Sequence, residues 1–305
     1  MSTVILGWFG HNNFGDELIL DSMLKHLVSG EVLVLSDDAD HTTRTHNVPA
    51  VEWRKYRVPY ATRFSVLGLL CVDWVHLLLA FRKASLIIVG GGGLWNDVFP
   101  LNILYYVGLP LLPALFGKPV IALGVGVDSK PRRTLSKVLL RLAGMFFSGI
   151  YVRDKRSQRY LSDLKVRSDV LFDLATLGSY VRQKTSGNLP IFAWAISPPA
   201  LAGLGSVKPI LELKTVKHVF ISCFDPEDIP AIRQVKQAHE CEIVTSNMER
   251  ILHVLSSADT VLSSRLHPLI VAAQLGIRTL ALARTEKIVS FLDNERDEAR
   301  AIQSP

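Results

Sequence analysis

The chain has 305 residues, of which 49% are hydrophobic and 20% are charged, and its formal net charge is +6. This composition excludes a disordered chain, and the length favours two domains, because single hydrophobic cores stop growing at roughly 250–300 residues. The excess of basic residues fits either a solvated surface or a preference for anionic ligands and anionic membranes. Nucleic acid is not expected as a partner, since no basic run is interleaved with aromatic residues.

The cysteine pattern and the apolar stretches bear on the compartment. Three widely spaced cysteines match neither a disulfide framework nor a CxxC metal site, which indicates a reducing compartment. No basic segment precedes the strand-like start, so we expect no signal peptide and a cytoplasmic protein. Residues 66–81 are too few to span a membrane, and residues 101–127 are interrupted by prolines. Both stretches are expected in an α/β core, with peripheral contact at the inner face of the membrane left open.

Short apolar runs alternate with helical patterns through the first part of the chain. Glu17–Leu27 has apolar residues at near-helical spacing and is predicted to be a helix. Several runs are continuous rather than alternating, as expected for strands that are covered on both faces. The order predicts a parallel sheet with right-handed crossovers. The runs are Val4–Phe9, Val32–Leu35, Leu86–Val89, Val120–Gly124 and Gly149–Val152.

The polar segment Gln183–Pro190 reads as a linker between a domain of residues 1–183 and a domain of residues 190–305. A second series of strands follows it, with helices predicted at Asp228–His239 and Met248–Ser257. We therefore predict an α/β protein with two Rossmann-like domains of mostly parallel strands that face a cleft. Ligands should bind at the carboxyl ends of the strands. The predicted strands are Ile191–Ile196, His218–Cys223, Cys241–Thr245, Thr260–Ser263 and Arg278–Ala283.

The first candidate loop, residues 7–17, reads GWFGHNNFGDE. It contains neither GxGxxG nor GK[ST], so it does not indicate a nucleotide site. Asp16 would serve either at the start of the following helix or, with Asn12 or Asn13, as an acceptor for sugar hydroxyls or a general base.

The second loop contains four consecutive glycines, Gly90–Gly93, at the end of a predicted strand. Four glycines cost chain entropy and contribute no packing, so we favour a backbone wall against a ligand. Asn96 and Asp97 would then add polar contacts.

Two later loops place arginines at strand ends. Arg153 is followed by Asp154, a pair that by itself is usually a surface feature. Arg265 and His267 lie between a strand and the predicted helix Leu269–Leu275, at a helix N-terminus, which favours anions. Arginine offers a planar fork for carboxylate or phosphate, and histidine transfers protons near neutral pH. The remaining histidines show no metal-ligand spacing, so no metal site is predicted.

Basic residues also recur at Lys130, Arg132, Arg133, Lys137 and Arg141. They would form a solvated helix face or a surface for anionic headgroups or the pyrophosphate of a lipid-linked oligosaccharide.

Taken in order, these loops resemble the polysaccharide pyruvyl transferase family. That family has a GDE loop, a GGG-L-x-D segment, a V-R-D-x-x-S segment and a late S-x-R-L-H segment. Asp97 fits with one extra residue before it, and Asp173 and Lys287 resemble further family positions. The matching segments are Asn12–Glu17, Gly91–Asp97, Val152–Ser157 and Ser263–His267.

The resemblance implies a GT-B-like fold and the transfer of enolpyruvate from phosphoenolpyruvate, as a cyclic ketal, onto a sugar. The sugar would belong to an exopolysaccharide, a cell-wall glycan or a lipid-linked oligosaccharide, and no cofactor is expected. Arg265 and Arg153, one from each domain, would clamp the donor, with His267 beside them as general acid or phosphate ligand. Asp16 or Asp97 would be the base. Further implied donor contacts are Leu266 and Ser264, and the implied acceptor contacts are Asn12, Asn13, Gly15, Gly91, Gly92 and Asn96.

Two other functions stay open. A GT-B glycosyltransferase using a nucleotide sugar would share the fold, and Glu286 is a candidate to grip its ribose. A non-catalytic subunit of envelope polysaccharide assembly is the other, although a scaffold has no need of Arg153, Arg265 and His267 together.

Overall fold

The computed structural model describes residues 2–53, 72–97, 101–127, 131–183, 189–199, 208–236, 241–245, 247–282, 285 and 287–293. The chain forms two compact units. Unit 1 contains Met1–His11 and Ile19–Leu174, and unit 2 contains Asn12–Leu18 and Ala175–Pro305. Part of the predicted linker, residues 184–188, lies outside the described residues.

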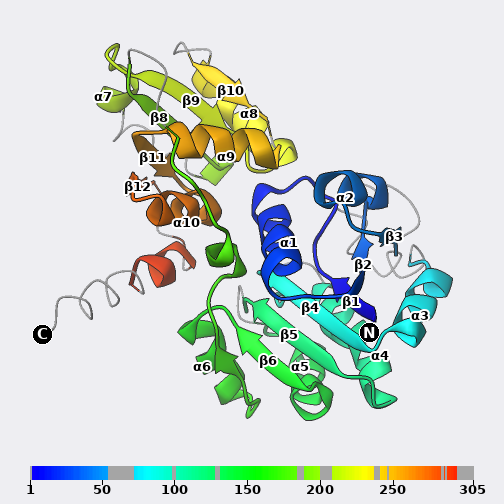
Figure 1. The fold of residues 1–305 in the computed structure, drawn as a ribbon. Helices are drawn as coiled ribbons and strands as arrows, with labels where there is room; N and C mark the ends of the chain where they lie inside the picture. Colours follow the sequence, from blue (N-terminus) through cyan, green and yellow to red (C-terminus); the bar gives the residue numbers. More distant parts are fainter. Residues whose placement is uncertain are drawn as a thin grey trace, which may run out of the picture. The chain divides into compact units, whose positions relative to one another are not determined.

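The described strands of unit 1 form a seven-stranded parallel sheet in the order β3-β2-β1-β4-β5-β6-β7 (Figure 1). Strand order reverses between β1 and β4, which both pair with parallel register, as at Val4 opposite Leu33 and Ile87. This arrangement is the doubly wound order, in which the reversal marks the usual ligand site. The strands are β1 (Ser2–Leu6), β2 (Glu31–Ser36), β3 (Ala50–Glu52), β4 (Leu86–Gly92), β5 (Val120–Val125), β6 (Gly149–Val152) and β7 (Asp169–Val170).

Helices cover both faces of this sheet. Right-handed crossovers place α1 and α2 on one face and α3, α4, α5 and α6 on the other. The buried side chains of α3, α4 and α5 accordingly share one core with the strands. The helices are α1 (Phe14–His26), α2 (Ala39–His46), α3 (Trp74–Lys83), α4 (Leu109–Leu115), α5 (Thr134–Phe146) and α6 (Lys155–Asp163), with a π-helical turn, η2 (Leu104–Gly108), before α4.

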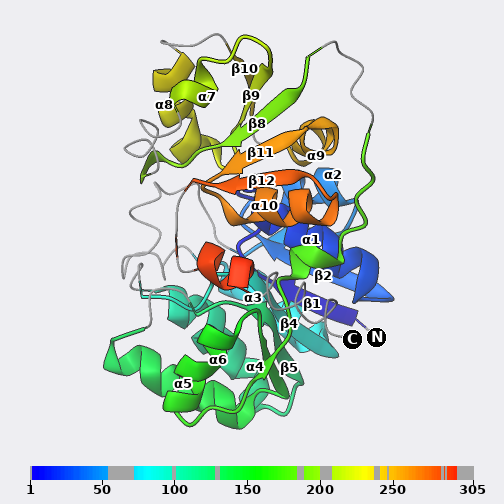
Figure 2. The same cartoon turned by 90° about the vertical axis from the view of Figure 1, so that its left-hand side faces the viewer.

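Unit 2 has a second parallel sheet, of five described strands, in the order β10-β9-β8-β11-β12 (Figure 2). The order reverses between β8 and β11, and Trp194 of β8 stacks on Phe220 of β9 at 5.6 Å between ring centroids. The strands are β8 (Ile191–Ala195), β9 (Lys217–Ile221), β10 (Glu242–Val244), β11 (Thr260–Ser263) and β12 (Arg278–Ala281). The helices are η3 (Leu174–Leu177), α7 (Lys208–Leu211), α8 (Asp225–Lys236), α9 (Met248–Ser257) and α10 (Leu266–Gln274), and a last helical segment spans residues 287–293.

The predicted α/β class with two Rossmann-like parallel sheets is confirmed. The first helix begins at Phe14 rather than Glu17, because the Asn13 side chain accepts a hydrogen bond from Gly15 N (3.1 Å) and caps it. Residues 66–71 of the first apolar stretch lie outside the described residues, and residues 74–83 form α3. Ala283, the end of the last predicted strand, also lies outside them. Within the described chain, no helix is both long and apolar enough to cross a membrane.

Candidate functional site

The loop after β11 forms a tight turn that leads into α10. Ser263 Oγ accepts a hydrogen bond from Arg265 N (2.9 Å) and donates one to Arg265 O (2.7 Å). Arg265 is the N-cap residue in an extended conformation, but its side chain makes no capping hydrogen bond. The N-terminus of α10 is therefore not capped by its own N-cap side chain, which suits it to an anionic ligand.

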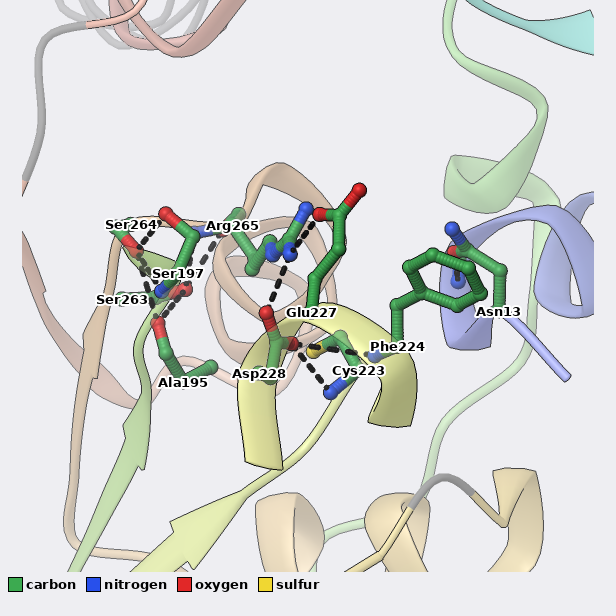
Figure 3. A network of polar contacts seen from close by, with 11 residues as sticks. Asn13, Ala195, Ser197, Cys223, Phe224, Glu227, Asp228, Ser263, Ser264 and Arg265 are labelled. Carbon is green, nitrogen blue, oxygen red and sulfur yellow. Dashed lines mark hydrogen bonds and ion pairs between the residues drawn. The ribbon is translucent and has the colours of Figure 1, made fainter. Parts of the chain in front are cut away.

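Ser264 joins the two strands at the order reversal of this sheet. Its Oγ accepts a hydrogen bond from Ser197 N (2.8 Å), and its backbone N–H donates to Ala195 O (2.9 Å) (Figure 3). The ends of β8 and β11 are thus held together at the point where ligands usually bind in this topology. Ser264, predicted as a donor contact, has this structural role, and Ser197 was not predicted from the sequence.

Arg265 lies between two carboxylates of α8. Its Nη2 donates to Glu227 Oε2 (2.8 Å) and to Asp228 Oδ1 (Figure 3). The other oxygen of Asp228 accepts from the backbone N–H groups of Cys223 (3.0 Å) and Phe224 (3.1 Å). Arg265 Nε is buried and has no hydrogen-bond partner in the part of the chain that the structure describes. The guanidinium is therefore oriented by Glu227 and Asp228, which both bond its Nη2.

Burial and charge act together on this cluster. Burial lowers the pKa of Arg265, but the neighbouring Asp228 and Glu227 outweigh it, so the pKa of Arg265 is raised and the side chain stays cationic. Burial raises the pKa of Asp228, and Arg265 opposes that rise. Burial, followed by the charge of Asp228, raises the pKa of the Cys223 thiol far above neutrality. A buried thiol whose pKa is raised in this way is a poor nucleophile.

The first turn of α1 belongs to the same unit as this cluster. Phe14 N donates to Cys223 O (2.8 Å), which joins the start of α1 to the loop after β9. A Cβ atom at Gly15 would overlap the imidazole of His267, so the backbone of α1 lies directly against that ring. Unit 2 thus contains the predicted residues Asn12, Asn13, Gly15, Asp16, Ser264, Arg265, Leu266 and His267, of which Gly15 lies against His267.

The predicted glycine wall in unit 1 has a packing explanation. A Cβ at Gly90 would lie 2.6 Å from Met23 Cε, and one at Gly91 would overlap the side chain of Ile19. Gly91 and Gly92 also have positive φ values of 65° and 72°, which side-chain-bearing residues rarely adopt. The close approach of α1 to β4 therefore accounts for Gly90 and Gly91 without a ligand.

Asn96 and Asp97 take part in hydrogen bonds within unit 1. Asn96 Nδ2 donates to Gly93 O (2.7 Å), and its Oδ1 accepts from Asn102 (3.1 Å). Asp97 accepts from the backbone N–H groups of Arg132 (2.6 Å) and Arg133 (2.9 Å) and from Ser136 Oγ (2.5 Å). Asp97 therefore holds the turn that precedes α5, which explains an aspartate at this position.

Arg153 is buried at the carboxyl end of β6 in unit 1. Its Nη1 lies 3.8 Å from Asp173 and its Nε 3.4 Å from Asp154, and a Cβ at Gly126 would lie 2.5 Å from Nε. Asp154 also caps α6 by accepting from Ser157 N (2.7 Å). The V-R-D-x-x-S segment thus combines a helix cap with a buried cation.

Several polar residues near strand ends were not predicted. Besides Glu227 and Asp228, His11 Nε2 lies 2.5 Å from Asp37 Oδ2, at the ends of β1 and β2. Glu227 and Asp228 could have been found from the acidic sequence Asp225-Pro-Glu-Asp, which comes soon after a predicted strand. No group of potential metal ligands occurs among the described residues. Glu286 and Lys130 lie outside them.

Comparison with solved structures supports the fold. UDP-N-acetylglucosamine 2-epimerase from Neisseria meningitidis is 12% identical with a TM-score of 0.56, covering 93% of this chain and 83% of that one. The enzyme of the same name from Methanocaldococcus jannaschii is 11% identical with a TM-score of 0.55, covering 92% and 83%. A glycosyltransferase from Rickettsia africae is 10% identical with a TM-score of 0.52, covering 92% and 79%. At these identities the similarity shows the GT-B-like fold alone.

Sequence comparison is more specific. No curated protein matches the chain. The family model for polysaccharide pyruvyl transferase, however, matches residues 13–286. That span includes the four loops on which the resemblance was based, except for Asn12, the first residue of the first loop. The chain therefore belongs to the polysaccharide pyruvyl transferase family.

Proposed function

We propose that the protein transfers the enolpyruvyl group of phosphoenolpyruvate onto a sugar as a cyclic ketal. The acceptor would be a sugar of an exopolysaccharide, a cell-wall glycan or a lipid-linked oligosaccharide precursor, in the cytoplasm. Family membership supports a pyruvyl transferase of polysaccharide biosynthesis. The observation that carries the proposal is the approach of the α1 backbone at Gly15 to His267, beside Arg265 at the α10 N-terminus.

The donor is an anion with a carboxylate and a phosphate. Two helix N-termini of unit 2, those of α1 and α10, favour negative charge, and Arg265 adds a permanent cation. Asp228 and Glu227 hold the guanidinium by one nitrogen, Nη2, and the Arg265 side chain, which is 22% exposed, remains accessible to an oxygen of the donor. This arrangement is suited to a phosphate or carboxylate group.

The proposed chemistry has two steps. His267, as imidazolium, protonates the vinyl carbon of the donor, and a sugar hydroxyl attacks the resulting electrophilic carbon while Asp16 accepts the hydroxyl proton. A second hydroxyl then attacks the same carbon, the carbon–oxygen bond to phosphate breaks, and phosphate leaves with the proton. We assign the base role to Asp16, because the carboxylate of Asp97 is engaged at the N-terminus of α5. Asn12 and Asn13 remain proposed acceptor contacts, and no cofactor is required.

Arg153 is proposed as a second cation for the donor. Its charge is already balanced by Asp154 and Asp173 within unit 1. Arg153→Lys keeps the charge but loses the planar fork, so a raised KM for phosphoenolpyruvate would support a bidentate contact. An unchanged KM would exclude that contact.

The test is to incubate the protein with phosphoenolpyruvate and lipid-linked or synthetic glycosides and to follow phosphate release together with the mass of the ketal product. His267→Gln should lower kcat by about 10²–10⁴-fold, the usual contribution of a general acid. His253→Gln in α9 is the matched control and should be unaffected. Wild-type turnover in His267→Gln would exclude the acid role, and a wild-type protein that releases no phosphate with any acceptor would argue against the reaction.

A nucleotide-sugar glycosyltransferase is the second candidate, because the similar Neisseria meningitidis structure is described as bound to UDP-N-acetylglucosamine. A thermal-shift comparison separates the two functions. Stabilisation by phosphoenolpyruvate but not by UDP-, GDP- or CMP-sugars supports pyruvyl transfer, and the reverse supports the glycosyltransferase.

A further inference from the structure

The positive charge of the chain is concentrated in one segment. Residues 74–153 contain nine Lys or Arg residues and only two acidic residues, Asp97 and Asp128. The net charge of this segment is therefore +7, whereas the net charge of the whole chain is +6. The remaining residues sum to a net charge of −1. The segment includes α3, α4 and α5, which lie on the same face of the unit 1 sheet.

Helix α5 has three strips along its length. Ser136, Leu140 and Ala143 are buried against unit 1. Arg133, Lys137 and Arg141, at i, i+4 and i+8, form a cationic strip. Beside it, a strip of exposed apolar side chains follows the i, i+3 and i+10 positions, Leu135, Val138 and Met145, the last being 73% exposed. An outward face that is apolar on one side and cationic on the other is typical of helices that lie in a membrane interface.

The end of α4 extends this apolar strip. Helix α4 packs against α5, and both lie together in the two ribbon views (Figures 1 and 2). Leu112, Leu115 and Phe116 are exposed there, and the Phe116 side chain is 87% exposed. A phenylalanine this exposed lacks the stabilisation that burial of its side chain would supply.

Helix α3 adds a second apolar strip on the same face of the sheet. Leu77, Ala80 and Phe81 are buried, whereas Trp74, Val75, Leu78 and Leu79 are exposed. Lys118, in the turn after α4, donates from Nζ to Arg82 O (3.0 Å) and Ala84 O (2.7 Å) at the end of α3. The last turn of α3 is therefore fixed beside the end of α4.

We propose that α3, α4 and α5 form a docking surface for an anionic lipid bilayer, with the exposed apolar side chains inserted among the headgroups and the cations on the lipid phosphates. Helices α3, α4 and α5 contain no acidic residue, so charge complementarity favours an anionic partner. A second copy of the same face would bring like charges together. Each Lys or Arg near an anionic membrane adds to the attraction, which salt screens. This proposal does not depend on the chemistry of the candidate site.

The test is flotation of the full-length protein with phosphatidylcholine vesicles, with and without phosphatidylglycerol, at low and high salt. The wild type should bind the anionic vesicles at low salt and be released at high salt. Phe116→Ser with Met145→Ser, and separately Arg133→Gln with Lys137→Gln and Arg141→Gln, should each weaken binding at least tenfold. Val181→Ser, at a 78% exposed apolar position in unit 2, is the matched control and should bind like the wild type.

Trp74 gives an independent readout, because quenching of its fluorescence by brominated lipids would place α3 at the bilayer. The quenching should be lost in Trp74→Phe. Absence of wild-type binding at low salt, or wild-type binding by both sets of variants, would overturn the proposal. A dimer that Phe116→Ser with Met145→Ser converts to monomer would also overturn it, because the surface would then be an interface between copies of this chain.

Discussion

Asp228 holds Arg265 in place from a fully buried position on α8. One carboxylate oxygen accepts from the guanidinium, and the other accepts from two backbone N–H groups at the end of β9. Both oxygens of Asp228 are therefore surrounded by donors. This geometry makes Asp228 a positioning residue for the cation that we assign to the donor.

Asp228→Asn should impair donor binding. The NH₂ group of the new asparagine would face either Arg265 or the backbone N–H groups of Cys223 and Phe224. In either orientation a hydrogen-bond donor faces another donor, so at least one of the present hydrogen bonds is lost. Because hydrogen bonds to charged groups contribute about 1.5–3 kcal/mol, we expect kcat/KM for phosphoenolpyruvate to fall by roughly 10–100-fold. Steady-state kinetics measures the change. Glu227→Gln, at the more exposed partner, is the control and should change kcat/KM by less than about threefold.

Arg265→Met should give a stability defect that depends on pH. Burial raises the pKa of Asp228, and without the opposing Arg265 that pKa rises further above its unfolded value of about 3.9. The folded state then holds the proton more tightly than the unfolded state, so stability is lost as pH rises toward the folded pKa. The free energy of unfolding should fall by about 3–5 kcal/mol at neutral pH and by less near pH ~4. Urea unfolding at both pH values measures this.

The double variant Arg265→Met with Asp228→Asn is the control for that experiment. The double variant lacks the titrating carboxyl group. The difference between its free energy of unfolding and that of the wild type should therefore not show the pH dependence that Arg265→Met alone introduces. An equal defect at both pH values in the single variant would mean that Asp228 is not the responsible group.

Gly15→Ala should affect turnover more than stability. Alanine favours the helix by about 1 kcal/mol over glycine, but its Cβ would overlap the His267 imidazole. The ring must move, and small displacements of catalytic groups cost up to ~10²-fold in rate. We therefore expect kcat to fall at least tenfold with little change in Tm. In the His267→Gln background, Gly15→Ala should have no further effect on residual turnover.

Gly91→Ala distinguishes a packing role from a ligand wall. A positive φ costs about 1–2 kcal/mol with a side chain, and overlap with Ile19 adds about 1–3 kcal/mol. The free energy of unfolding should fall by roughly 2–5 kcal/mol, while the KM for the acceptor stays unchanged. Ile19→Ala leaves a cavity of its own, so the check is a cycle: Gly91→Ala should cost less in the Ile19→Ala background than in the wild type, by the part due to overlap. A raised acceptor KM with unchanged stability would instead support the ligand wall.

The sequence predicted the buried strands well, because parallel strands that are covered on both faces appear as continuous apolar runs. Helix α9 has the predicted bounds Met248–Ser257, where the polar cap Asn247 precedes a clear helical repeat. Strands β3 and β7 were missed, since they have three and two residues and exist through pairing with a neighbouring strand. Such pairing depends on tertiary register and leaves little trace in a short sequence.

The candidate site was predictable in its strand-end loops but not in its partners. Arg265 and His267 were found because their types and their place before a helix indicate anion chemistry. Asp228 was taken as a helix start, since its contact with Arg265, 37 positions away, is a tertiary property. The packing role of residues 90–91 was not predictable for a similar reason: Ile19 and Met23, which need the space, are distant in sequence.

Unit 2 is assembled from two separate pieces of the chain, residues 12–18 and residues from 175 onward. A recombinant fragment starting at Ala175 would therefore lack the helical turn whose backbone touches His267. Exchange of this unit between members of the family would have to transfer both pieces, since an incoming side chain at position 15 would collide with the imidazole. The two segments must therefore be exchanged together. A chimeric enzyme with a single junction would combine residues 12–18 of one protein with the His267 loop of another, and its site would lack the matching contact.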